Sequence, residues 1–256
     1  MNFSSVRLLG AALAITCFLA IESAQVVAGP LTAGQTPTVT IRIDDTQPNP
    51  TTWSYTPPVE AFERATDADG GFELDAPRSF EILGNRAEVT IEELQFDPDP
   101  FVLNNILVTN NTTATQLFSA FVGFPTTFGA PNVIKGSVRT SVIDGGLDGA
   151  TVATQGGSAL YQAQIDLATV ATLQNDPFSV TAGVGGSNTA SAAFGPTANG
   201  TAVTSSIGIQ LRFTLTPGDT AAILSRFDVV PEPMSAVLLG AGLVMVTGMG
   251  GRRNRR

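Results

Sequence analysis

The chain has 256 residues, a net charge of −9 and no histidine, and its single cysteine is Cys17. These counts exclude a Ser-His-Asp triad, a Cys-His pair and the usual His/Cys sites for zinc, copper or haem. The excess of acidic over basic residues also makes nucleic acid a poor partner, because phosphate binding needs a basic face. Carboxylate chemistry such as glycoside hydrolysis is still open, but sequence spacing gives no distance between two carboxylates. We expect a protein that is not an enzyme.

The N-terminal segment, residues 1–28, has the parts of a secretory signal peptide. Arg7 precedes an apolar run, Leu8–Ile21, and small residues lead to Ala28, after which cleavage is expected. Cys17 lies in the middle of the apolar run and not at its end, so lipidation is not expected. The secretion translocon and signal peptidase are therefore expected partners, and the mature chain has no cysteine for a disulfide.

The body of the chain, residues 29–230, is predicted to be one ectodomain built from β-strands. The clearest strand is Ile207–Thr216, in which large apolar residues alternate with polar residues or glycine without a break. A turn follows at Pro217-Gly218-Asp219, and a final strand leads through Phe227 to Val229. The alternation in the clearest strand predicts Ile209, Leu211 and Phe213 inside, and Gln210 and Arg212 exposed.

Earlier segments show the same period of two with more interruptions. Between Val89 and Phe96 the apolar positions shift by one residue at Glu92-Glu93, which predicts a β-bulge. Phe101–Asn110 and Thr115–Phe124, with a short polar turn between them, are predicted to form a hairpin. Further strands are expected at Val39–Ile43, Asn132–Ile143, Ala159–Asp166 and Pro177–Ala182.

Only two segments depart from this pattern. Leu167–Gln174 has room for one or two helical turns, and Gly183–Gly200 is predicted to be a long loop with one weak strand at Ala190–Phe194. Short strands with Gly, Asn, Asp and Pro between them are typical of antiparallel β-proteins. The predicted fold class is therefore all-β, a single antiparallel β-sandwich or jelly roll over residues 37–230.

Trp53 and Tyr55 alternate within a proline-bounded segment, Pro50–Pro57. Two such aromatic side chains can present apolar faces to sugar rings on the surface of a β-sandwich, or they can pack in the core. Both interpretations stay open, and we keep Trp53 and Tyr55 as candidate ligand-binding residues.

Two loops place carboxylates beside glycines, at Asp67-Ala68-Asp69-Gly70-Gly71 and at Asp144-Gly145-Gly146-Leu147-Asp148-Gly149. Calcium binds six to eight such oxygens, but neither loop fits the EF-hand pattern, and turns use the same residues. If the ectodomain binds calcium, Asp67 and Asp69 are the better candidates. No other cofactor is expected.

The last residues of the chain, Val229–Arg256, fall into three parts. Pro231, Glu232 and Pro233 come first, and then Met234–Gly251 runs without a charge. As a helix this run would be about 27 Å long, just enough to cross a bilayer core. A basic cluster that would stay cytoplasmic ends the chain, with Arg252, Arg253, Arg255 and Arg256.

This tail resembles the PEP-CTERM sorting signal of bacterial secreted proteins, in which a Pro-Glu-Pro motif precedes a membrane helix and an arginine-rich end. The resemblance covers residues 231–256 and implies recognition by an exosortase, cleavage near the motif, and an envelope location. The protein would be held in the cytoplasmic membrane by its C-terminal helix before processing and released to the cell surface or outside afterwards. Four short phrases resemble an ectodomain type that recurs in proteins with this tail, but imply no activity: FDPDPF (Phe96–Phe101), VTNNT (Val108–Thr112), ALYQAQID (Ala159–Asp166) and LTPGD (Leu215–Asp219).

Two functions are compatible with these observations. The first is a surface or matrix protein with a non-catalytic structural or adhesive role, associated with exopolysaccharide. The second is a carbohydrate-binding β-sandwich module, calcium-dependent if Asp67 and Asp69 bind the ion.

Overall fold

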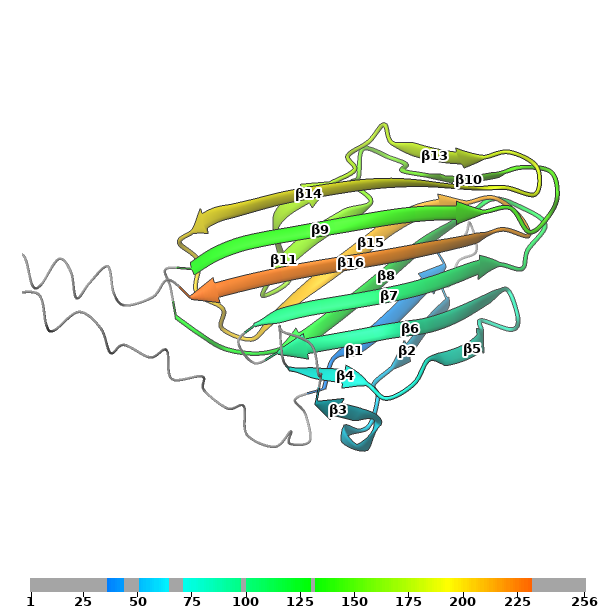
Figure 1. The fold of residues 1–256 in the computed structure, drawn as a ribbon. Coiled ribbons are helices and arrows are strands. Elements are labelled where there is room, and N and C mark those ends of the chain that lie inside the picture. Colours follow the sequence, from blue (N-terminus) through cyan, green and yellow to red (C-terminus); the bar gives the residue numbers. More distant parts are fainter. Residues whose placement is uncertain (1–35, 44–50, 65–70, 98–99, 130–131, 232–256) are drawn as a thin grey trace, which may run out of the picture. The chain divides into compact units, whose positions relative to one another are not determined.

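The computed structural model describes residues 36–43, 51–64, 71–97, 100–129 and 132–231, all within one compact unit, Leu31–Arg256. This part of the chain is all-β, as predicted, with one short 3-10 helix, η1 (Val59–Ala61), beside its sixteen strands. The strands form two antiparallel sheets that face each other in a β-sandwich-like arrangement (Figure 1).

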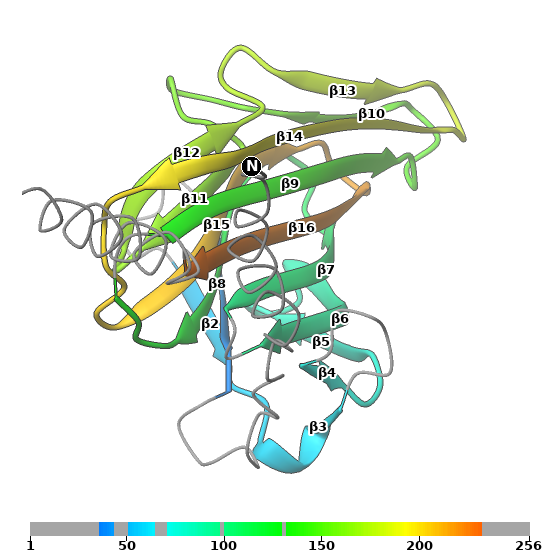
Figure 2. The ribbon, with the colours of Figure 1, turned by 60° about the vertical axis from the view of Figure 1, so that its left-hand side comes forward.

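The first sheet has the order β12-β11-β15-β8-β1-β2, and β10 joins it beside β15 and carries β13. Figure 2 shows β11 and β12 beyond β15, at one side of this sheet. Its strands are β1 (Thr38–Ile43), β2 (Thr51–Tyr55), β8 (Gln116–Pro125), β10 (Ala150–Ala153), β11 (Tyr161–Ile165), β12 (Ala168–Leu173), β13 (Ser179–Ala182) and β15 (Ser206–Leu215).

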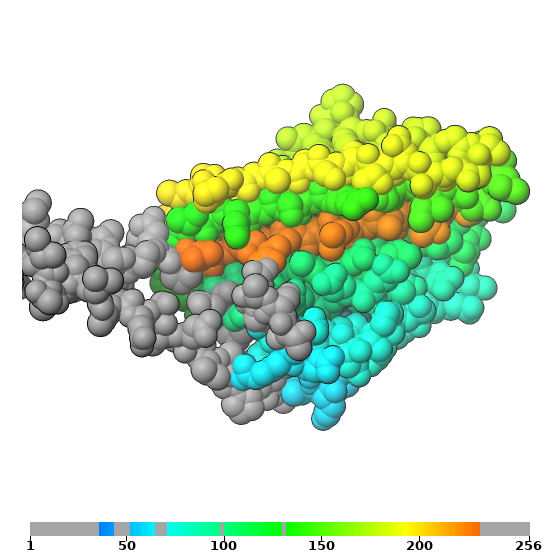
Figure 3. Space-filling view, in the orientation of Figure 1, coloured from blue at the N-terminus to red at the C-terminus, as the bar shows by residue number. Residues whose placement is uncertain are grey.

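The second sheet has the order β14-β9-β16-β7-β6-β4-β3, and β5 also pairs with β6. Its outer face appears in Figure 3 as bands of β14 (yellow), β9 (green) and β16 (orange) side by side. Its strands are β3 (Phe62–Arg64), β4 (Phe72–Leu74), β5 (Arg78–Ile82), β6 (Ala87–Asp97), β7 (Phe101–Asn110), β9 (Asn132–Ile143), β14 (Ser187–Asn199) and β16 (Thr220–Pro231).

The core lies between the sheets and is made of alternate residues from both. Phe96 of β6 and Phe124 of β8 meet across the gap, with ring centroids 4.7 Å apart. The buried hydroxyl of Tyr161 in β11 crosses the same gap and donates a 2.9 Å hydrogen bond to the carbonyl oxygen of Arg226 in β16. Aromatic packing and this hydrogen bond thus hold the two sheets together at separate points.

Strand β15 confirms the clearest sequence prediction on its inner face. Ile209, Leu211 and Phe213 are buried, and β15 lies inside the sheet between β11 and β8. Gln210 and Arg212 were expected to be exposed, but they are only half-exposed. Their side chains lie among those of two neighbouring strands, because an interior strand is flanked on both sides. The predicted bulge is also present, as a register shift between Ile91 and Glu93.

The hairpin predicted from Phe101–Asn110 and Thr115–Phe124 is wrong. β7 pairs with β6 and β16 in the second sheet, whereas β8 pairs with β1 and β15 in the first. The connection between them crosses from one sheet to the other. Sequence alternation gives the face of each strand but not the partner, and both strands here have two partners from elsewhere in the chain.

Two other segments were also assigned wrongly. Gly183–Gly200, predicted to be a loop with one weak strand at Ala190–Phe194, contains the thirteen-residue strand β14, which includes and extends that weak strand, and Leu167–Gln174 contains β12 instead of a helical turn. Both are outer strands with one main partner, β9 for β14 and β11 for β12. The small and polar residues of β14 are mostly exposed, so alternation is visible only around Ala190–Phe194, and the rest of the strand is defined by its backbone pairing with β9.

Candidate functional site

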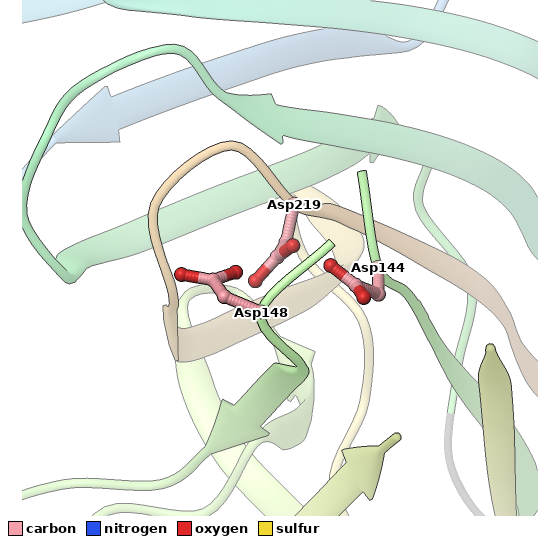
Figure 4. A group of neighbouring side chains, drawn as sticks. All are labelled: Asp144, Asp148 and Asp219. Carbon is pink, nitrogen blue, oxygen red and sulfur yellow. The ribbon is translucent and has the colours of Figure 1, made fainter. Parts of the chain in front are cut away.

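Three aspartates from two loops meet at one end of the second sheet (Figure 4). Asp144 directly follows β9, Asp148 lies further along the β9–β10 loop, and Asp219 lies in the β15–β16 turn. They meet because β9 and β16 are neighbours, with Ile143 paired to Thr220. One carboxylate oxygen from each lies within 4.8 Å of the others. Asp144 and Asp219 are buried, and Asp148 is exposed.

Backbone amides surround Asp144. Its Oδ2 accepts hydrogen bonds from the N–H of Gly185 at 2.6 Å and of Gly149 at 3.2 Å, and its Oδ1 accepts one from Leu147 at 2.9 Å. The hydrogen bond from Gly185 is the main reason why the pKa of Asp144 lies below its ordinary value, and it outweighs the opposing effect of burial. Asp144 thereby joins the β13–β14 loop to the β9–β10 loop.

Asp219 has a similar role in its own turn. It accepts hydrogen bonds from the N–H of Gly145, at 3.2 Å, and from the hydroxyl of Thr216. Hard cations such as calcium prefer this set of oxygens, and the three carboxylates could supply part of such a shell. Amide and hydroxyl donors bind the carboxylates of Asp144 and Asp219, so these two side chains also join the neighbouring loops by hydrogen bonds.

The sequence pointed to Asp144 and Asp148 only as turn residues or weaker calcium ligands, and it did not connect them with Asp219. The signal available was the turn Pro217-Gly218-Asp219. Asp219 lies more than seventy residues from Asp144 in the sequence, so the proximity of the two carboxylates follows only from the pairing of β9 with β16.

Another aspartate that joins two segments by hydrogen bonds is Asp166, in the turn between β11 and β12. Its carboxylate accepts hydrogen bonds from the N–H groups of Thr204, Ser205 and Ser206, at 2.9, 2.7 and 3.0 Å. The hydroxyls of Thr204 and Ser205 also donate to it. Burial acts to raise the pKa of Asp166, but the N–H groups of Ser206 and Thr204 and the hydroxyls of Thr204 and Ser205 together hold it well below its ordinary value. The turn is thus fastened to the start of β15.

Because the folded-state pKa values of Asp144 and Asp166 are depressed, their stabilising effect is present above the unfolded-state pKa of about 4 and is lost as the pH falls through the folded values. We expect the melting temperature to fall steadily below about pH 4. Asp166→Asn should lower it at pH 7 and reduce the further loss in acid. Thermal unfolding from pH 7 to pH 3 measures both effects. Glu81→Gln, on an exposed residue of β5, is the control, and equal pH profiles for Asp166→Asn and the parent would contradict the prediction.

Trp53 and Tyr55 lie on β2 opposite Ile41 and Val39, so they point to the inner side of the first sheet. Both rings contact Phe80 of the second sheet, with centroids 4.8 and 4.7 Å away, and both side chains are half-buried. They close one edge of the sandwich by aromatic packing. A role in sugar binding is still a prediction for these two residues.

The other predicted site residues lie mostly outside the described residues. Pro231 is described as the last residue of β16, where it is paired with Asn132. Among the described residues, no helix is long and apolar enough to cross a membrane. The following lie outside the described ranges: Asp67, Asp69, Glu232, Pro233, the run Met234–Gly251, Arg252, Arg253, Arg255 and Arg256.

Comparison with known proteins gives no relative from which a function could be transferred. No family model matches the chain, and a search of curated proteins finds no match. The function must therefore be inferred from the residues of this chain.

Proposed function

We propose that this is an exported protein of the bacterial cell surface or extracellular matrix, processed at its C-terminus by an exosortase, with a non-catalytic structural or adhesive role in association with exopolysaccharide. The observation that carries the proposal is the order of three features at the C-terminus. Pro231-Glu232-Pro233 precedes the uncharged run Met234–Gly251, and an arginine cluster follows. Each feature alone is common, but together they specify an address in the envelope.

The position where the folded domain ends supports a separation between the ectodomain and the sorting tail. β16 ends at Pro231, where the Pro-Glu-Pro motif begins, so the motif adjoins the last paired residue of the sandwich. A protease or transpeptidase acting at or just after the motif would leave every described strand intact. In this proposal the ectodomain and the sorting tail are separate functional units that share one residue.

The composition of the chain supports a non-catalytic role. The absence of histidine and of any cysteine after Cys17 leaves carboxylate chemistry as the main catalytic route. The carboxylates of Asp144, Asp166 and Asp219 are occupied with loop amides and hydroxyls, a supporting role for which each has specific donors.

A second candidate is a carbohydrate-binding module that recognises a particular sugar, with or without calcium. It is favoured by the half-exposed Trp53 and Tyr55 at one edge of the sandwich. This role would also place the protein on a polysaccharide, but through a specific site instead of a general association.

Changing Pro231, Glu232 and Pro233 to alanine should stop C-terminal maturation and leave membrane insertion intact, because the motif lies outside the apolar run. In a producing cell, mass spectrometry should find the parent protein without its tail and the alanine variant with it. Deleting the exosortase should leave the tail on the parent protein as well.

The control is a variant with a changed residue in the ectodomain, Glu81→Gln on an exposed position of β5, which should be processed like the parent. If the parent protein keeps residues 234–256 in cells with and without the exosortase, the sorting proposal fails and a plain membrane anchor is left.

A further inference from the structure

The outer face of the first sheet carries two rows of side chains, polar except for Phe121, across three neighbouring strands. In one row Arg212 of β15, Ser119 of β8 and Arg42 of β1 are paired neighbours. In the next row Gln210, Phe121 and Thr40 are paired in the same way. In Figure 1 these three strands lie side by side in the sheet behind β16 and β7. The rows line a groove of about 540 Å³, within the range of ligand sites.

In this groove the ring of Phe121 lies against the backbone of the sheet at Gly123 and Gly208. Its neighbours one step along the strands are Gly123 and Gly208, which are paired with each other. A Cβ atom at Gly123 or Gly208 would come within 2.6 or 2.8 Å of the Phe121 ring. The two glycines therefore make the space in which the ring rests on the backbone, and the half-buried ring keeps part of its surface towards the groove. An aromatic ring held in this way is a platform for the apolar face of a sugar.

The groove is basic, although the chain as a whole is acidic. The described residues that line it include two arginines and no carboxylate. The Nε atom of Arg212 is shielded from solvent and has no hydrogen-bond partner in the described part of the chain. The guanidinium also carries donors on its two Nη atoms, and through a pair of parallel hydrogen bonds it can bind a carboxylate or sulfate. Arg42 is exposed on the other side of Ser119, two strand spacings or roughly 10 Å away along the row.

Gln210 adds a neutral donor beside the ring. Its Oε1 accepts a 2.9 Å hydrogen bond from Nε2 of the buried Gln164, which fixes the amide and leaves its NH₂ group available. Arginine, amide and aromatic ring thus lie together on neighbouring strands, where the sheet holds them rigidly.

We infer that this groove binds an acidic polysaccharide, with the ring of Phe121 under a sugar and the guanidinium of Arg212 on the anionic group of that sugar or its neighbour. The inference rests on the proposed association with exopolysaccharide and names the site and the class of sugar. The shared ligand chemistry is an anionic group on a sugar ring, either a uronic acid carboxylate or a sulfate ester.

The test measures binding of the full chain, purified in a detergent without a sugar headgroup, to three immobilised polymers: polygalacturonate, dextran sulfate and neutral dextran. The parent protein should bind an anionic polymer in preference to neutral dextran. Arg212→Gln should weaken this binding by at least about tenfold, the usual effect of losing hydrogen bonds to a charged group. Phe121→Ala should weaken it as well.

Gln210→Glu provides a variant with little risk to folding, because a glutamate can still accept the hydrogen bond from Gln164 while it repels an anionic sugar. The matched control is Arg139→Gln, on an exposed arginine of β9 in the other sheet, which should bind like the parent. Preference for polygalacturonate or for dextran sulfate, with the same dependence on Arg212, would identify the anionic group as carboxylate or sulfate.

Two results would overturn the inference in different ways. If the parent binds but Arg212→Gln, Gln210→Glu and Arg139→Gln all behave alike, the groove is not the site, and the association with polysaccharide stands. If the parent binds none of the three polymers, the groove and the proposed polysaccharide association both fail, whereas the sorting proposal depends only on the mass of the processed chain.

Discussion

Truncating Phe213 to alanine is expected to lower the free energy of unfolding by about 3–5 kcal/mol. The side chain is fully buried on β15, inside the first sheet, and its ring stacks on Phe118 of β8 with centroids 5.8 Å apart. Removing it forfeits the transfer free energy of a large apolar group and leaves a cavity that rigid neighbouring strands cannot fill. Urea denaturation of the parent and the variant measures the difference.

Phe213→Leu is the graded control for this prediction. It keeps most of the apolar volume and should therefore lose less stability than the alanine variant. If alanine changed the free energy of unfolding by less than about 1 kcal/mol, in the range of surface substitutions, the inner face of β15 would not be in the core.

Asn110→Ala is expected to destabilise the protein by about 2–4 kcal/mol, because several backbone groups lose their partners at about 1–3 kcal/mol each. Asn110 is fully buried at the end of β7, where the chain leaves the second sheet for the first. Its Nδ2 donates to the carbonyl oxygens of Ala114 and Leu215, both at 2.9 Å, and its Oδ1 accepts from Thr112 N–H at 3.0 Å. One side chain therefore fixes both the crossover and the end of β15.

The matched control is Asn111→Ala, one residue further along. Asn111 is exposed, and within the described part of the chain its side chain makes one long contact of 3.5 Å, with Asn85. Its replacement should leave the unfolding midpoint nearly unchanged. Equal destabilisation by the two variants would mean that the turn matters as a whole and that the buried amide of Asn110 has no special role.

The residues predict the strands with a buried face far better than they predict the partners of those strands. β15, β9 and β1 follow from alternation, because one face of each is covered by the core. Only the Ala190–Phe194 part of β14 was predicted, since the side chains of this strand are mostly small and exposed and its backbone is held by β9. The predicted hairpin of β7 and β8 was wrong for a related reason. The alternation of side chains in a strand is the same whichever strand it pairs with, so it does not identify the partner.

Sites that depend on long-range pairing were correspondingly hard to predict. The proximity of Asp219 to Asp144 requires β16 to lie against β9, and the rows in the groove require β15, β8 and β1 to be adjacent. The polar residues of the groove look like an ordinary solvent face in sequence. Only the register shows that Arg212 and Phe121 belong to neighbouring rows of one surface.

The position of β16 bears on how the chain can cross a membrane. This strand, the last before the tail, lies between β9 and β7, so it joins the two halves of the second sheet. If the chain is exported from its N-terminus, as we propose, β16 is delivered last, and until then β14 and β9 have no connection to β7 and β6 within that sheet. Under that proposal the sandwich would close only after β16 has been delivered. Release by cleavage upstream of Pro231 would shorten the central strand, so a cut that spares β16 is a condition for a stable secreted product.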